Sequence, residues 1–197
     1  MRDALLAAAV KQFAARGVAT VSVAELIAEA DVSRATFYQF FSSKYSLLEY
    51  ILNPIFDYAV ARIEALAEET PRRALDGIAD VYCALWREHR DGLLLIPDID
   101  PPTFRRFEPR HRALNAALLA VLTAAEGEGL LRNGSAHFSL KVIARTAIPL
   151  LRVYDGHPAA ETLFRDALTA LLVAAPQREA PRRENAAHVS STRARDR

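Results

Sequence analysis

The spacing of apolar residues constrains this chain more than any other feature, because it follows the period of a helix almost everywhere. Apolar side chains recur three and four residues apart, and no segment alternates with the period of two that a half-buried strand needs. The connection at 91–102 holds one glycine and three prolines and is predicted to form at most one helical turn. The predicted helices cover about 5–16, 23–30, 33–40, 43–67, 71–90, 103–126, 137–154 and 158–175.

We therefore predict an all-α fold of about eight or nine helices, with an N-terminal three-helix head and a C-terminal helical bundle. The head covers residues 1–45 and the bundle 46–175, while the tail 176–197 lacks an apolar stripe and is predicted to be disordered. No uninterrupted apolar run approaches the ~18 residues of a membrane span. We expect a cytoplasmic protein, and its single cysteine excludes an internal disulfide.

The charge of the head is balanced, so composition alone does not predict a nucleic-acid partner. The chain has a formal net charge of +1, and residues 1–50 hold five basic and five acidic residues. A nucleic-acid footprint must then come from the placement of a few cations. We expect modest nonspecific affinity for DNA and a shallow salt dependence.

Local signals place two short helices around a tight turn. Ser22 and Glu25 have the spacing of a capping box, and Asp31 marks a turn because aspartate tolerates the left-handed conformation. Ser33 can cap the next helix, and Ser42 or Ser43 can cap the long helix that follows. Two short helices joined in this way form a helix-turn-helix.

The third helix has two different faces. Wound at about 100° per residue, Phe37 and Phe41 lie on the inner side with Val32 and Ser33. The outer side carries a guanidinium, a methyl, a phenol and an amide, which are groups that read base edges or bind phosphates. These outer residues are Arg34, Ala35, Tyr38 and Gln39. Periodicity alone also permits an ordinary amphipathic helix without DNA binding.

Thr20 and the segment VAELIAEADVSRATFYQFFSSKYSLL at 23–48 resemble the TetR-like family of helix-turn-helix transcriptional regulators. The resemblance covers about the first 50 residues, and beyond them it extends only to apolar helices after a GLLR turn. It implies a DNA-binding regulator, a repressor that a small-molecule effector releases from a pseudo-palindromic operator, acting as a homodimer on double-stranded DNA.

The resemblance also implies roles for single residues. Arg34, Ala35, Thr36 and Gln39 face base edges or nearby sugars, and Thr20, Ser33, Tyr38 and Lys44 contact phosphates. Lys44 suits this role independently, since it starts a helix whose N-terminus favours an anion. Asp31 stands where the family usually has a glycine. Phe40 occupies a phosphate-contacting position of the family, yet helical winding places it near the inner face.

The last two predicted helices carry apolar stripes that look too wide for the core of one subunit. We expect them to form the dimer interface, and the alternative is that both helices are buried within one subunit. The predicted interface residues are Leu140, Ile143, Ala147, Leu151, Phe164, Leu168 and Leu171.

An effector pocket is predicted among aromatic residues of the bundle, with Arg145 or His111 as a polar anchor. Each of these aromatics could instead be ordinary core. Pro54, inside the fourth helix, is either a hinge between pocket and head or a static kink. The predicted effector-binding residues are Tyr58, Tyr82, Trp86, Phe104, Phe107, His111 and Arg145.

Catalysis and cofactor binding find little support, and we expect neither an enzyme nor a bound metal. Glu108 and His111 have the spacing used in di-iron bundles, but the chain holds no second copy. Cys83 lies among apolar neighbours and reads as core rather than as a nucleophile. The alternatives to a regulator are a helical ligand-binding or enzymatic bundle without DNA binding, and an architectural DNA binder without sequence preference.

Overall fold

The computed structural model describes residues 1–174, and the predicted tail at 176–197 lies outside the described residues. Helices make up most of this part of the chain, and the all-α prediction is confirmed. The α-helices are α1 (Arg2–Arg16), α2 (Val23–Ala30), α3 (Arg34–Phe40), α4 (Lys44–Ala65), α5 (Pro71–Leu95), α6 (Pro101–Phe104), α7 (Glu108–Gly127), α8 (Ala136–Tyr154) and α9 (Ala160–Leu172). Three 3-10 turns, η1 (Leu66–Glu68), η2 (Ile96–Asp98) and η3 (Arg105–Phe107), connect them.

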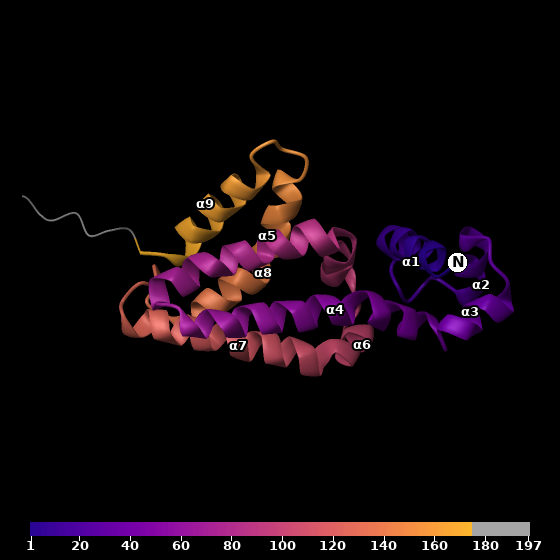
Figure 1. Cartoon of the computed structure of the whole chain (residues 1–197), viewed down its shortest axis with the longest axis horizontal. Coiled ribbons are helices and arrows are strands. Elements are labelled where there is room, and N and C mark those ends of the chain that lie inside the picture. The colour runs from indigo at the N-terminus through magenta and orange to yellow at the C-terminus, as the bar shows by residue number, and fades with distance from the viewer. Residues whose placement is uncertain (175–197) are drawn as a thin grey trace, which may run out of the picture.

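The molecule is elongated, with a small head at one end and a larger body at the other (Figure 1). Helices α1, α2 and α3 form the head, and α4 leaves it to run along the body. Helices α5 and α7 pack on α4, while α8 and α9 form a pair that packs on α5 and α7. Because α1 also contacts α5, the head is attached to the body at two places.

The proline-rich connection is more helical than predicted. Helix α5 continues to Leu95 across a break at His89, whose φ of −136° and ψ of 25° are not helical. Pro101 then stands in the first turn of α6, and the Asp100 carboxylate accepts a hydrogen bond from the Thr103 N–H at 3.0 Å. A proline in the first helical turn loses no hydrogen bond and presets φ, so these prolines begin short helices instead of preventing them.

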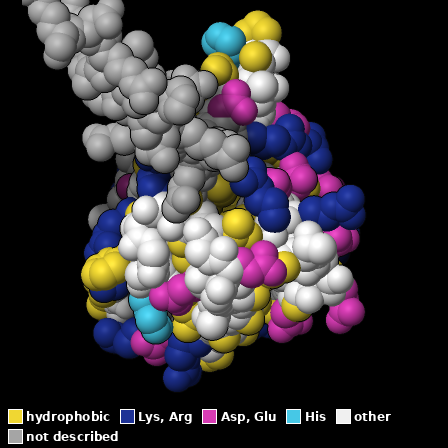
Figure 2. All heavy atoms as spheres, turned by 90° about the vertical axis from the view of Figure 1, so that its left-hand side faces the viewer, with side chains coloured by type: hydrophobic (Ala, Val, Ile, Leu, Met, Phe, Trp, Pro, Cys, Tyr) yellow, Lys and Arg dark blue, Asp and Glu magenta, His cyan; other side chains and the backbone are white. Residues whose placement is uncertain are grey.

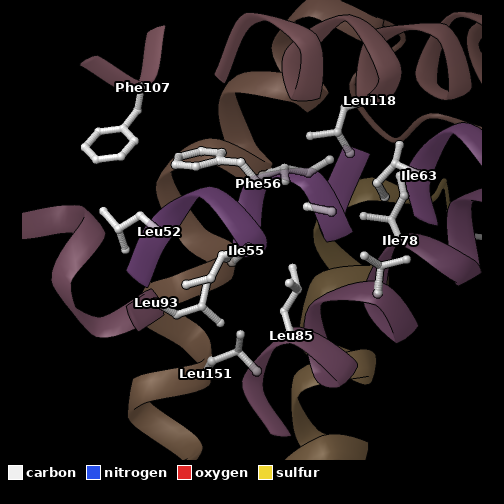
Figure 3. Close-up of a cluster of buried hydrophobic side chains, with 14 of the residues drawn as sticks. Leu52, Ile55, Phe56, Ile63, Ile78, Leu85, Leu93, Phe107, Leu118 and Leu151 are labelled. Atoms are coloured by element: carbon white, nitrogen blue, oxygen red, sulfur yellow. The ribbon is translucent and has the colours of Figure 1, made fainter. Parts of the chain in front are cut away.

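The body encloses a core to which α4, α5, α7 and α8 contribute (Figure 3). Phe56 of α4 stacks on Phe107, with ring centroids 6.0 Å apart and an interplanar angle of 22°. At one crossing α4 and α5 approach so closely that a Cβ added at Gly92 would lie 2.4 Å from Cδ1 of Ile55. The segment before α8 is held against the chain after α9 by an isolated antiparallel bridge between Leu131 and Val173.

Most of the predicted dimer-interface residues are covered within their own subunit. Five of the seven are 0–4% exposed; these are Ile143, Ala147, Leu151, Phe164 and Leu168. Leu140 is half-buried, and Leu171 is 40% exposed. The large apolar side chains that α8 presents to solvent are Phe138 and Val153, at 60% and 73% exposure.

Ion pairs join α5 to the α8–α9 pair. Arg87 donates to Glu161 at 2.5 Å, Arg165 donates to Asp80 at 2.7 Å, and Arg90 pairs with Asp155 at the end of α8. At the end of the body away from the head, basic and acidic side chains are interspersed on the visible surface (Figure 2). Within residues 1–174, no helix is long and apolar enough to cross a membrane.

Candidate nucleic-acid interface and ligand cavity

A reciprocal hydrogen-bond pair starts α2, as the Ser22–Glu25 spacing predicts. The Ser22 hydroxyl accepts from the Glu25 N–H at 3.2 Å, and the Glu25 carboxylate accepts from the Ser22 N–H at 2.7 Å. Arg16 at the end of α1 also donates to Glu25, at 2.6 Å. The Ser22 backbone bond and then the Arg16 bond lower the pKa of Glu25 to about 2. The carboxylate therefore fixes both the cap and the angle between α1 and α2.

Asp31 makes the turn between α2 and α3. Its φ of 49° is left-handed, and among the described residues no other non-glycine residue has a positive φ. The N–H of Val32 then donates to the carbonyl of Ile27 at 3.2 Å, which closes the end of α2. Ser33 caps α3 by accepting from the Thr36 N–H at 3.0 Å, and the two hydroxyls are 2.8 Å apart. Both the turn and the cap agree with the prediction.

The two faces of α3 are oriented as its sequence predicts. Phe37 is 0% exposed and Phe41 is buried, with their ring centroids 6.0 Å apart. Arg34, Ala35, Tyr38 and Gln39 are all exposed, whereas Thr36 is half-buried. The guanidinium of Arg34 lies over the Tyr38 ring at 5.6 Å from its centroid. We call the exposed residues Arg34, Ala35, Tyr38 and Gln39 the α3 strip.

Phe40 does not lie on the inner face, where helical winding places it; its side chain is 43% exposed. Helix α3 ends at Phe40, and the backbone of Phe41 is extended, with a φ of −139°. This change of conformation turns the Phe41 ring into the core and leaves the Phe40 ring beside the α3 strip. An apolar side chain thus occupies an exposed position where the TetR-like resemblance implies a phosphate contact.

Lys44 and Thr20 have partners inside the head. The Lys44 ammonium donates to the carbonyls of Ala19 and Val21 at 2.8 and 2.7 Å, which ties the start of α4 to the α1–α2 connection. Burial lowers its pKa, against the opposing charges of Asp100 and Glu25. The Thr20 hydroxyl donates to the Arg16 carbonyl at 2.6 Å. Phosphate contacts by these two side chains stay predictions, and in this structure both groups hold the head together.

Ser43 caps α4, which decides between the two predicted serines. Its hydroxyl accepts from the Ser46 N–H at 3.1 Å, and the Ser46 hydroxyl accepts in return from the Ser43 N–H at 3.0 Å. Ser33, the other predicted phosphate contact at a helix start, is exposed.

Most cations of the head are engaged by other groups. Lys11 pairs with Glu29 at 2.5 Å and Arg16 pairs with Glu25. Within residues 1–174, Arg34 forms no ion pair. Its charge on α3 is therefore available to a phosphate or a base. Sequence spacing did not predict the Lys11 and Arg16 pairs, because they join residues on different helices.

The body contains a cavity of about 110 Å³, lined by residues of α4, α5, α7 and α8. Two of the predicted effector-binding residues, Tyr82 and His111, line it. Asn115, which sequence reasoning missed, also lines it and places its amide nitrogen 3.4 Å from Nδ1 of His111. The four-residue spacing of His111 and Asn115 on one helix face is the signal that could have revealed it.

The other five predicted effector-binding residues do not line the cavity, because they pack elsewhere. Phe107 is buried against Phe56, and the Phe104 ring meets His111 edge-on at 5.1 Å. Tyr58 packs against His89 at 6.0 Å, and Trp86 lies under the guanidinium of Arg90 at 5.5 Å. Arg145 is exposed on α8. Of the two predicted polar anchors, Arg145 is therefore absent from the cavity walls, whereas His111 is part of them.

Burial shifts the polar groups of the cavity toward their neutral forms. It raises the pKa of Tyr82 to about 12 and lowers the pKa of His111. Burial likewise raises the pKa of the Cys83 thiol, which fits the predicted core role better than that of a nucleophile. At neutral pH the cavity thus offers an uncharged phenol, an uncharged imidazole and an amide.

A small head with an exposed helix after a tight turn defines the class of helix-turn-helix proteins. Residues 5–51 match the family model described as bacterial regulatory proteins, tetR family. No curated protein matches the chain.

Solved structures of transcriptional regulators resemble the whole fold. The ketosteroid transcriptional regulator KstR2 of Mycobacterium tuberculosis is 20% identical, with 88% of this chain and 95% of that chain covered and a TM-score of 0.73. The TetR family regulator PfmR from Thermus thermophilus is 20% identical, with 90% and 98% covered and a TM-score of 0.71. This chain has the fold and the N-terminal domain of a TetR-family transcriptional regulator, and the predicted resemblance is confirmed.

Proposed function

We propose that this protein is a homodimeric transcriptional repressor that reads a pseudo-palindromic operator and is released by a small-molecule effector. The observation that carries the proposal is the α3 strip, which is exposed on a helix held by a cap at its start and by Phe37 beneath it. In this proposal residues 1–45 form the DNA-binding domain and 46–175 the ligand-binding and dimerisation domain. Helix α4 crosses that boundary and so joins the two functions.

The chemistry of the α3 strip suits the major groove. Arg34 can donate two hydrogen bonds to guanine, Gln39 can pair with adenine, and the methyl of Ala35 can contact the methyl of thymine. The Tyr38 hydroxyl suits a phosphate, which would position the helix without reading sequence. Because Arg34 carries the charge of the strip, we expect few phosphate contacts and a shallow dependence of affinity on salt.

The exposed apolar side chains of α8 and α9 support dimer formation. Phe138, Val153 and Leu171 are exposed and lie outside the subunit core. Large exposed apolar groups on neighbouring helices favour association, and a two-fold axis would present two copies of α3 to one duplex. The half-sites would then be separated by about one helical turn or somewhat more.

The contacts between cavity and head support effector control. Next to Phe107, which packs in the body core, Arg106 places its guanidinium 4.5 Å from the centre of the Tyr45 ring. Arg106 also pairs with Glu49 at 3.2 Å, so η3 is bound to the first turns of α4 by two contacts. His111 of the cavity lies one turn into the following helix. A ligand that moves the start of α7 would therefore move η3 and, through it, α4 and the head.

Selection of bound sites from random duplexes tests the proposal. We expect enrichment of one inverted repeat, because two subunits related by a two-fold axis present the same strip. Enrichment of a single unrepeated site would contradict the dimer, and recovery of duplexes without any shared sequence would contradict specific reading. A ligand-binding bundle without DNA binding is the alternative that the internally paired cations of the head favour, and it would retain no duplex.

A further inference from the structure

The walls of the body cavity are mostly apolar, with polar groups from two helices. Ile55 and Phe56 of α4, Leu85 and Leu93 of α5, and Leu118 of α7 are among the apolar lining residues that Figure 3 labels. Tyr82 of α5 and the pair His111 and Asn115 of α7 supply the polar groups. A ligand would meet apolar surface over most of its body and hydrogen-bonding groups at these three side chains.

These polar side chains have capacity to bond a ligand. Tyr82 is half-buried, and no described residue forms a hydrogen bond with its hydroxyl. If His111 Nδ1 accepts from the Asn115 amide, its Nε2 carries a proton and can donate, and the carbonyl oxygen of Asn115 can accept. The cavity can therefore both donate to and accept from one polar group of a ligand.

The cavity lacks charged walls. Among the residues that line it within the described chain there is no lysine, arginine, aspartate or glutamate. Moving an ion from water into such surroundings costs several kcal/mol unless a partner charge is present. The lowered pKa of His111 adds to this, since the imidazole stays neutral near pH 7 and cannot pair with an anion.

The size of the cavity limits the ligand to about one ring. Its volume is about 110 Å³. For comparison, an apolar protein cavity of about 150 Å³ binds benzene, and one water occupies about 30 Å³ of the liquid. Multi-ring compounds would need the walls to move.

We propose that the cavity binds an uncharged, single-ring-sized molecule whose one hydroxyl or carbonyl group bonds to polar side chains among Tyr82, His111 and Asn115. This inference rests on the proposed function, because it names the chemical class of the effector. Of the two predicted polar anchors it uses His111 and not Arg145, and the proposed contacts are hydrogen bonds between neutral groups.

Calorimetric titration of the full chain without DNA tests the ligand class with four matched probes. 4-Methylphenol is the uncharged probe with a hydroxyl, toluene lacks the hydroxyl, and benzoate and benzylammonium carry opposite charges. We expect saturable binding of 4-methylphenol, about 5- to 10-fold tighter than toluene, as one or two hydrogen bonds provide. Benzoate and benzylammonium should bind at least about 100-fold more weakly. Equal or tighter binding of either ion, or no saturable binding of any probe, overturns the inference.

Variants locate the hydroxyl of the probe. Replacing Tyr82→Phe together with Asn115→Leu should abolish the preference for 4-methylphenol over toluene, while toluene itself still binds. Tyr58→Phe makes the same chemical change outside the cavity and should leave both affinities unchanged, with circular dichroism confirming that each variant is folded. A preference that survives in the double variant overturns the assigned position.

Operator release is measured separately, so that the two proposals fail in different ways. If 4-methylphenol binds but leaves a selected operator bound, the ligand class stands and effector control by this cavity fails. If the operator is bound specifically and no probe binds the free protein, the regulator stands and the ligand class is wrong.

Discussion

The ammonium group of Lys44 joins two parts of the head. It lies at the start of α4 and donates to two carbonyls of the α1–α2 connection, Ala19 and Val21. A half-buried donor with two carbonyl acceptors holds these segments in place, and its loss would leave both acceptors without that partner. The resemblance to TetR-like regulators implies a phosphate contact for this residue, so its two possible roles need to be separated.

Replacing Lys44→Met should lower the free energy of unfolding by about 1–3 kcal/mol, as expected when two carbonyls lose a charged donor. Urea unfolding measures this. The slope of log K for DNA against log salt should stay unchanged if Lys44 acts only within the head, and fall by about 1 if it contacts a phosphate. Lys11→Met removes an exposed ion pair and should change stability by no more than about 1 kcal/mol.

Glu25 should make the stability of the head depend on pH in the acidic range. Its pKa in the folded protein is about 2, against an ordinary value of 4.5, so the charged carboxylate stabilises the fold above pH 4.5. That contribution is lost as the pH falls from 4.5 toward 2. Glu25→Gln should therefore be less stable than the wild type at pH 7, and the difference should disappear near pH 2. A difference that is constant over this range would contradict the role of the charge.

Short-range spacing predicted the caps and the turn of the head, because a cap depends on residues three positions apart. Ser22 with Glu25, Asp31 and Ser33 all act as predicted. The exposure of Phe40 was not predicted, because it depends on where α3 ends. No neighbouring residue indicates that the backbone of Phe41 becomes extended. The partners of Lys44 could not be predicted, since they lie more than twenty positions away.

Among the helices, α4 links the two functions of the chain and carries Pro54 on its exposed side. An interior proline removes the hydrogen bond to the carbonyl four residues earlier, here that of Tyr50. The opposite side of α4 packs tightly, because Ile51 and Ile55 leave no room for a side chain at Gly92 of α5. The proline therefore loosens α4 on its solvent side next to a rigid crossing.

Replacing Pro54→Ala should raise the free energy of unfolding by about 1–3 kcal/mol, since the helix regains a hydrogen bond and the exposed ring gives up little packing. Pro109→Ala is the matched control, because Pro109 stands in the first turn of α7 and should change stability by less than about 0.5 kcal/mol. If Pro54 is a hinge, the variant also weakens the response of operator binding to ligand. An unchanged response would mean that Pro54 is a static kink and not a hinge.

The apolar period predicted where the helices lie, but it did not predict where helices begin and end in the proline-rich segment at 91–102. The continuation of α5 past His89 depends on tertiary packing of Leu93 and Leu95, which are 2% and 3% exposed. Single turns such as α6 are too short for a period to be recognised. Their only local signal is a proline after a capping residue, as at Asp100 and Pro101.

For the chain as a whole, the apolar period could not tell which chain covers the wide stripes of α8 and α9. A stripe shows which residues avoid water but not whether the cover comes from the same chain. Here α5 and α7 cover Ile143 and Phe164 within the subunit. Two of the seven predicted effector-binding residues line the cavity, and the period could not separate them from the others, because apolar residues that line a cavity and those that fill a core have the same period.

Dimer formation is tested at the exposed apolar side chains. Phe138→Arg together with Val153→Arg should convert a dimer to a folded monomer, since both side chains are more than half exposed and contribute little to the subunit core. Light scattering gives the mass. Leu168→Arg is the contrasting variant, because Leu168 is 1% exposed and a buried arginine should unfold the subunit. A wild-type protein that is already monomeric would contradict the dimer.

The central claim is that the α3 strip reads DNA sequence, and the most direct test compares two duplexes with two proteins. The wild type and the double variant Arg34→Ala with Gln39→Ala are titrated with the selected operator and with a scrambled duplex of the same composition. Each lost bidentate contact removes about 1–3 kcal/mol of discrimination, so the variant should bind both duplexes with nearly the weak affinity that the wild type shows for the scrambled one. A variant that keeps the wild-type preference for the operator would contradict the claim.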